Sequence, residues 1–127
     1  MKEILLVGLG GFLGSIARYK AGGIVLHAAQ PSDFPYGTLA VNIAGCILIG
    51  LLAGTAERFG IFGESSRLLI FTGLLGGFTT FSAFSLDAVF LLRKGELMLA
   101  ALYVGASVLA GIFATWLALR SFSFIPR

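Results

Sequence analysis

The segment from Gly76 to Ser85 combines residue types that could bind ions. It reads Gly-Gly-Phe-Thr-Thr-Phe-Ser-Ala-Phe-Ser. Adjacent glycines weaken a helix, and unwound backbone frees carbonyl oxygens, which suit a hard cation such as Na⁺. Phe81 and Phe84 are three residues apart and share a helix face, and the positive edges of aromatic rings can attract a small anion. The alternative is that the rings only face lipid or the core while the hydroxyl groups bond back to their own helix.

Further polar side chains recur at helical spacing in two other apolar stretches. Thr38 and Asn42 are four residues apart, and the Asn42 amide offers two uncharged donors to an anion. Tyr103 and Ser107 have the same spacing on another stretch, which puts them on one helix face. Polar groups at membrane depth are costly unless they face the protein interior or a wet path. Each pair could equally serve hydrogen bonding between helices.

The composition favours lipid as the surroundings of the chain. Of its 127 residues, 57% are hydrophobic and only 12% are charged, and the mean hydropathy is +0.98. A soluble domain of this size leaves a large share of its surface wet. The length allows one domain, so we predict a single transmembrane domain over residues 1–127. The net charge of +3 comes from scattered Lys and Arg residues, which we interpret as loop and helix-end anchors and not as a nucleic-acid-binding surface.

Four stretches approach the ~20 apolar residues that a membrane-spanning helix needs. They are residues 4–26, 36–56, 68–92 and 97–119. Pro, Gly and charged residues separate them, and residues 93–96, Arg-Lys-Gly-Glu, are typical of a tight turn. We therefore predict an all-α membrane protein with four transmembrane helices, of which the third is broken near mid-membrane.

The positive charges divide almost equally between the two sides of such a bundle. One side carries five (Lys2, Arg58, Arg67, Arg120 and Arg127) and the other four (Arg18, Lys20, Arg93 and Lys94). Because Lys/Arg asymmetry normally fixes orientation, this near tie predicts insertion in both directions, which would permit an antiparallel homodimer. If Arg18 lies inside the membrane and is not counted, the bias becomes a mild five to three.

Small residues predict close helix packing, and enzyme chemistry has no support. Gly10 and Gly14 are four residues apart, as are Gly73 and Gly77, and this spacing lets helix backbones touch in lipid. The single histidine, His27, and the single cysteine belong to no nucleophile–base set, metal motif or phosphate loop. We therefore predict that the chain is not an enzyme.

Three motifs together resemble the Fluc (CrcB) family of fluoride channels. They are the segment at 76–85, the sequence Gly-Thr-Leu-Ala-Val-Asn at 37–42, and the spacing of Gly10, Gly14 and Arg18. Chain length, span number and motif order agree along the whole chain. The resemblance implies a fluoride-selective channel that exports F⁻ passively and so relieves fluoride toxicity. It also implies an antiparallel dual-topology homodimer in the inner membrane of a prokaryotic cell.

The same resemblance implies roles for individual residues. A structural Na⁺ would lie at the dimer centre, bound by the backbone carbonyls of Gly76 and Thr79 from each subunit. The residues expected to line the fluoride pore are Asn42, Phe81, Phe84, Tyr103 and Ser107. Arg18, Thr38 and Thr80 are expected to support the pore.

Two other functions stay open on the sequence. A small dual-topology multidrug or guanidinium exporter needs a carboxylate inside its first helix, but Glu3 precedes that span and Asp87 belongs to the third. A non-transporting subunit of a larger membrane complex would suit the glycine rows. It would leave the hydroxyl and amide groups at mid-membrane unexplained.

Overall fold

The computed structural model describes residues 1–29 and 32–124, and all regular structure in these residues is helical. Three spans are single helices: α1 (Lys2–Ala28), α2 (Tyr36–Phe59) and α6 (Leu97–Arg120). The third span consists of four pieces: α3 (Glu64–Arg67), the π-helix η1 (Leu68–Leu75), α4 (Gly76–Phe78) and α5 (Phe81–Arg93). A short 3₁₀ turn, η2 (Ser121–Phe124), follows α6.

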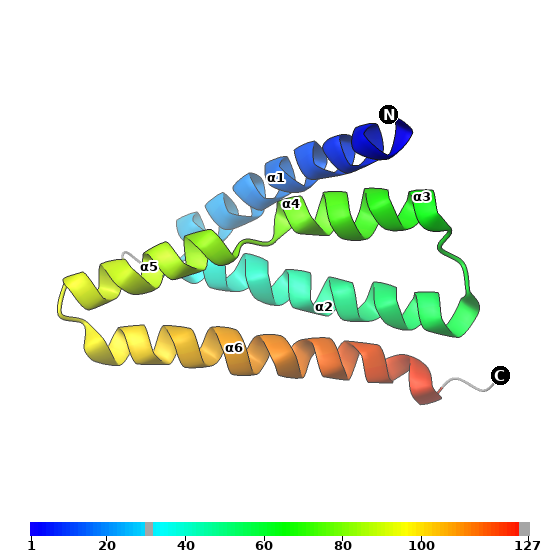
Figure 1. Cartoon of the computed structure of the whole chain (residues 1–127). Coiled ribbons are helices and arrows are strands. Elements are labelled where there is room, and N and C mark those ends of the chain that lie inside the picture. Colours follow the sequence, from blue (N-terminus) through cyan, green and yellow to red (C-terminus); the bar gives the residue numbers. More distant parts are fainter. Residues whose placement is uncertain (30–31, 125–127) are drawn as a thin grey trace.

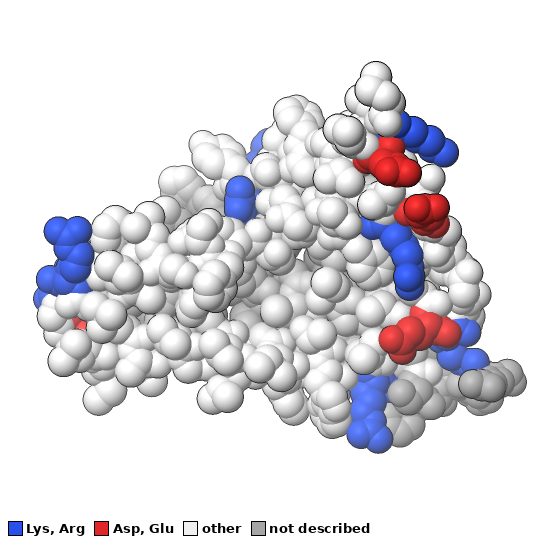
Figure 2. Space-filling model, in the orientation of Figure 1, with Lys and Arg blue, Asp and Glu red and all other residues white. Residues whose placement is uncertain are grey.

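Four stretches of the described residues are long and apolar enough to cross a membrane, which confirms the predicted four-helix membrane fold. They are Lys2–Ala28, Tyr36–Phe59, Glu64–Arg93 and Leu97–Arg120. Figure 1 shows the N-terminus, the α2–α3 connection and η2 at one end, and the turn between α5 and α6 at the other. The charged side chains visible in Figure 2 gather mainly at these two ends, with largely uncharged surface between them. This distribution suits a bundle whose middle lies in hydrocarbon.

Helix α1 packs on η1 and α4 with backbone against backbone. A Cβ atom added at Gly14 would lie 2.1 Å from the Leu74 carbonyl oxygen, and one at Gly77 would lie 2.5 Å from the Gly11 carbonyl oxygen. No larger residue fits at these two positions without moving a helix. The glycine spacing therefore serves close packing, as the sequence predicts.

Helix α2 packs on α6 over most of its length, and a small core closes one end of the bundle. A Cβ atom at Gly50 would lie 2.6 Å from the Thr115 carbonyl oxygen, so glycine again allows the close approach. The core near the α5–α6 turn consists of Ala88, Leu91, Ala100 and Tyr103, with Phe34, Leu39, Phe84 and Leu99 packed against it. This core holds α5 beside α6.

The predicted break in the third span is confirmed, but the glycine pair does not form it. Thr79 (φ −89°, ψ 160°) and Thr80 (φ −153°, ψ 121°) are extended, whereas Gly76 and Gly77 remain helical. Gly77 is needed for contact with α1, and the extended residues follow it two positions later. The sequence of Leu68–Leu75 carries no pattern that predicts the π-helix η1.

Candidate functional site

Asn42 holds the break in the third span open. Its Nδ2 donates to the Thr80 carbonyl oxygen at 3.0 Å, and its Oδ1 accepts from the Thr80 amide at 2.9 Å. In a continuous α-helix the Thr80 amide would donate to the Gly76 carbonyl. The Asn42 side chain thus replaces one helical hydrogen bond and pairs both backbone groups of an extended residue.

The Thr80 side chain replaces a second helical hydrogen bond. Its Oγ1 accepts from the Ala83 amide at 3.2 Å and so caps the N-terminus of α5. In a continuous helix that amide would donate to the Thr79 carbonyl. The carbonyls of Gly76 and Thr79, which the family resemblance in the sequence implies as Na⁺ ligands, are therefore the two whose helical amide donors bond to side chains instead.

A cavity of about 240 Å³ lies beside the break and collects most of the predicted pore residues. Its lining consists of Asn42, Thr79, Thr80, Phe81, Phe84 and Ser107. Residues from the second, third and fourth spans thus meet at one place, although they are far apart in the sequence. We refer to this cavity as the break cleft.

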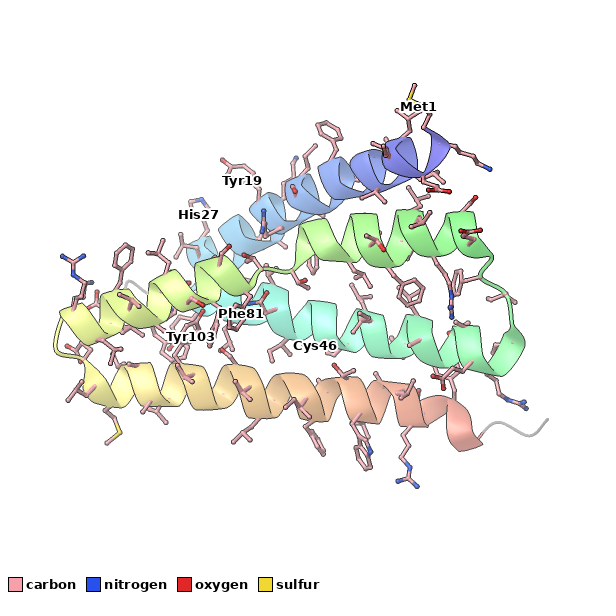
Figure 3. All side chains as sticks on the ribbon, in the orientation of Figure 1. Met1, Tyr19, His27, Cys46, Phe81 and Tyr103 are labelled. Atoms are coloured by element: carbon pink, nitrogen blue, oxygen red, sulfur yellow. The ribbon has the colours of Figure 1, made fainter. Side chains whose placement is uncertain are left out.

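Three aromatic rings form a row that starts at the break cleft. The ring centroids of Phe81 and Phe84 are 5.4 Å apart, and those of Phe84 and Tyr103 are 5.3 Å apart. The exposed fraction changes along the row, from 79% at Phe81 to 0% at Tyr103. Figure 3 shows Phe81 and Tyr103 in the region between α5, α2 and α6.

The hydroxyl groups of the fourth span have different surroundings. Ser107 Oγ is buried and has no hydrogen-bond partner among the described residues, so its donor is available to a guest in the break cleft. Tyr103 Oη instead donates to Asp87 Oδ2 at 3.4 Å. Tyr103 is not part of the cleft lining. Its ring packs against the Phe84 ring, which does line the cleft. Asp87 is a partner that sequence reasoning left without a role.

Arg18 and Thr38 lie in a second cavity, of about 450 Å³. Thr80 and Ser82, at the start of α5, line it as well. Thr80 also lines the break cleft, so the two cavities meet at this residue. The predicted supporting residues are therefore placed next to the predicted pore residues.

A family model described as "CrcB-like protein, Camphor Resistance (CrcB)" matches residues 5–119. The chain belongs to this family. Its CrcB-like relatives include proteins named fluoride-specific ion channel from Methylobacillus flagellatus, 47% identical over 92% of this chain and 91% of the relative, and from Novosphingobium aromaticivorans, 46% identical over 94% of each. A third, from Rhizobium etli, is 48% identical over 90% of this chain and 93% of the relative. The family resemblance that the sequence motifs suggested is confirmed.

This CrcB-like chain also uses a residue that sequence reasoning missed. A Cβ atom added at Gly45 would lie 2.1 Å from the Thr79 Cγ2 methyl group. Gly45 therefore makes room for the extended segment on the side of α2. Its only sequence signal is its position three residues after Asn42, about one helical turn along the same face.

Proposed function

We propose that the chain is a fluoride channel and that the break cleft is part of the fluoride path. Relatives that match nearly the whole chain are named fluoride-specific ion channels. The observation that carries the proposal is the meeting of Asn42, Ser107 and the rings of Phe81 and Phe84 around one cavity. A channel performs no chemical conversion, which agrees with the prediction that the chain is not an enzyme.

The groups around the break cleft suit a small, strongly hydrated anion. A narrow path must replace the water of such an ion with other favourable contacts. Asn42 Nδ2 carries two hydrogens and gives one to Thr80, which leaves one for fluoride. Ser107 offers its hydroxyl, and the ring edges of Phe81 and Phe84 add a weak positive potential. Neutral contacts also let the ion leave, which conduction requires.

The N-terminus of α5 strengthens this preference for an anion. The helix begins at Phe81, which lines the break cleft. A helix N-terminus carries a partial positive charge that favours negative ions. The cleft thereby attracts fluoride although none of its lining residues is a Lys or an Arg.

The functional unit that we propose is an antiparallel homodimer. Phe81 is 79% exposed in the single chain, so the pore wall on this side is incomplete without a second copy. The near-equal division of Lys and Arg between the two ends supports insertion in both orientations. The bilayer and fluoride are the other partners. Four spans and bacterial relatives support a multi-pass protein of a prokaryotic membrane, and we assign it to the inner membrane.

A structural Na⁺ between the two copies fits the freed carbonyls. Hard cations take oxygen ligands, backbone carbonyls included, and broken membrane helices supply them. The Gly76 and Thr79 carbonyls have lost the amides of Thr80 and Ala83 to side-chain acceptors. One pair of carbonyls from each copy would give a bound Na⁺ four oxygen ligands.

The exporter alternative requires a carboxylate inside the first span, and α1 has no Asp or Glu beyond its first turn. Glu3 is in the first turn of α1 and is exposed. Asp87 is on α5 and accepts the hydroxyl of Tyr103. The non-transporting alternative does not explain why the Ser107 hydroxyl is buried without a hydrogen-bond partner among the described residues.

Ion efflux from liposomes tests the proposed function. The purified chain, reconstituted alone, should release fluoride and retain chloride, each followed with an ion-selective electrode. Equal release of both anions, or of neither, contradicts the proposal. Orientation is tested separately with Cys46→Ala, Ser65→Cys, because Ser65 is exposed near the α2–α3 connection and its replacement leaves the Lys and Arg count unchanged. Dual insertion predicts that an impermeant thiol reagent labels about half of the molecules from each side.

A further inference from the structure

We propose that Phe34, in the loop between α1 and α2, is a positioning residue for the fluoride path. Its ring holds Tyr103, and through Tyr103 it fixes the angle of Phe84. The inference rests on the proposed function, because it assumes that fluoride passes the aromatic row. It goes further in assigning part of the pore geometry to a residue outside the four membrane spans.

The rings form one continuous row that leads from this loop to the break cleft. The Phe34 and Tyr103 centroids are 5.7 Å apart with an interplanar angle of 87°, which is the edge-to-face arrangement that aromatic pairs prefer. Tyr103 is fully buried, so its ring turns only if its neighbours move. The row continues to Phe84 at 5.3 Å and from there to Phe81 at 5.4 Å.

Local contacts hold Phe34 in place. Its carbonyl accepts from the Tyr36 amide at 2.9 Å, and its own amide donates to Ser32 Oγ at 3.3 Å. The Tyr36 ring lies 4.7 Å from the Phe34 ring, centroid to centroid. Phe34 also packs on the buried core that includes Tyr103 and Leu91. A large, rigid side chain held on several sides can orient a neighbouring ring.

An ion pair attaches the loop to the elements that carry the pore rings. Asp33 pairs with Lys94, which follows α5 in the turn to α6. Phe84 is on α5 and Tyr103 is on α6. The pair is exposed and therefore contributes little stability by itself. It connects the residue before Phe34 with the turn at the end of the α5–α6 pair.

Single-channel recording of Phe34→Leu tests the proposal, because leucine keeps an apolar side chain but removes the ring. Phe62→Leu is the matched control, since Phe62 makes a similar edge-to-face pair with Phe71 (5.8 Å, 81°) at the opposite end of the bundle. We expect Phe34→Leu to lower the fluoride conductance of each open channel about two- to tenfold, and Phe62→Leu to leave it unchanged. A purely structural role would reduce only the number of active channels. Unchanged conductance in Phe34→Leu overturns the inference.

A second measurement does not depend on conduction. In a Tyr19→Phe, Tyr36→Phe background, 3-fluorotyrosine labels Tyr103 alone, since the chain has three tyrosines. We expect Phe34→Leu to shift or broaden the ¹⁹F resonance and Phe62→Leu to leave it in place. An unmoved resonance in Phe34→Leu overturns the inference. If the wild type carries no fluoride current but Phe34→Leu still shifts the resonance, the proposed function is contradicted. The contact between Phe34 and Tyr103 is then supported all the same.

Discussion

The carboxamide of Asn42 and the backbone of Thr80 make two reciprocal hydrogen bonds, of 3.0 and 2.9 Å, across the gap between α2 and the third span. One side chain thus satisfies both the donor and the acceptor of an extended residue at membrane depth. Without it both groups would lose their protein partners at a depth where few other partners are available. The same bonds leave one amide hydrogen of Asn42 and the Gly76 carbonyl without a partner from this pairing. A single contact therefore connects the proposed fluoride path with the proposed Na⁺ site.

Asn42→Ala should lower both stability and fluoride efflux. The substitution leaves the partly buried N–H and C=O of Thr80 without these partners, and a fully buried unpaired group costs about 1–3 kcal/mol. Thermal unfolding in detergent and liposome efflux measure the two effects. Thr55→Ala is the control on the same helix, because it removes only an exposed hydrogen bond to the Leu51 carbonyl. If Asn42→Ala behaves like this control, Asn42 does not hold the break open.

Gly45→Ala should displace the extended segment, and removal of one methyl group should reverse the effect. The new Cβ would lie 2.1 Å from Thr79 Cγ2, and such overpacking typically costs about 1–3 kcal/mol. Thr79→Ser deletes that methyl group but retains a hydroxyl for the 3.0 Å bond to the Leu75 carbonyl. We expect weak efflux from Gly45→Ala and recovery in Gly45→Ala, Thr79→Ser. Failure of the double variant to recover would show that the methyl contact is not the cause.

Gly14→Ala should separate α1 from the third span. Its Cβ would lie 2.1 Å from the Leu74 carbonyl oxygen, a backbone atom that cannot rotate away. Gly8→Ala is the matched control, since nothing lies within 4 Å of a Cβ at that position. We expect a clear loss of thermal stability for Gly14→Ala, and none for Gly8→Ala because alanine favours helix. Equal melting temperatures for the two variants would contradict the packing described for α1.

Removal of Na⁺ should reduce fluoride efflux. Purification and reconstitution in N-methylglucamine salts would leave the carbonyls of Gly76 and Thr79 without a cation. We expect slow efflux that recovers when Na⁺ is added to the protein before reconstitution. Efflux that is equally fast after thorough Na⁺ removal would mean that the freed carbonyls serve another purpose.

Much of the architecture could be predicted from the sequence, because long apolar stretches in lipid have few alternatives to helix. The break in the third span was also predictable to within residues 76–85, but not which of these residues are extended. Gly76 and Gly77 have the weaker helix propensity, but both are helical, and Gly77 packs against the backbone of α1. The extended residues are Thr79 and Thr80, which gain hydrogen bonds and caps from tertiary partners.

The candidate site was predictable only in part, for a related reason. Residue type and helical spacing pointed to the polar and aromatic side chains, and the structure brings most of them to one cleft. Phe34 had no such signal and Gly45 had only its spacing from Asn42, since the importance of both depends on which atoms of other elements lie beside them. Contacts between elements far apart in the sequence set those neighbours.

Unitary fluoride current through Phe81→Ala and Phe84→Ala channels is the measurement that tests the break cleft as the ion path most directly. Phe81 is 79% exposed in the single chain, so its truncation removes little internal packing, and Phe113→Ala, with 59% exposure at a position away from the cleft, serves as the control. We expect folded protein in every case, normal current from the control, and greatly reduced current from both cleft variants. Normal current through both Phe81→Ala and Phe84→Ala would contradict the account.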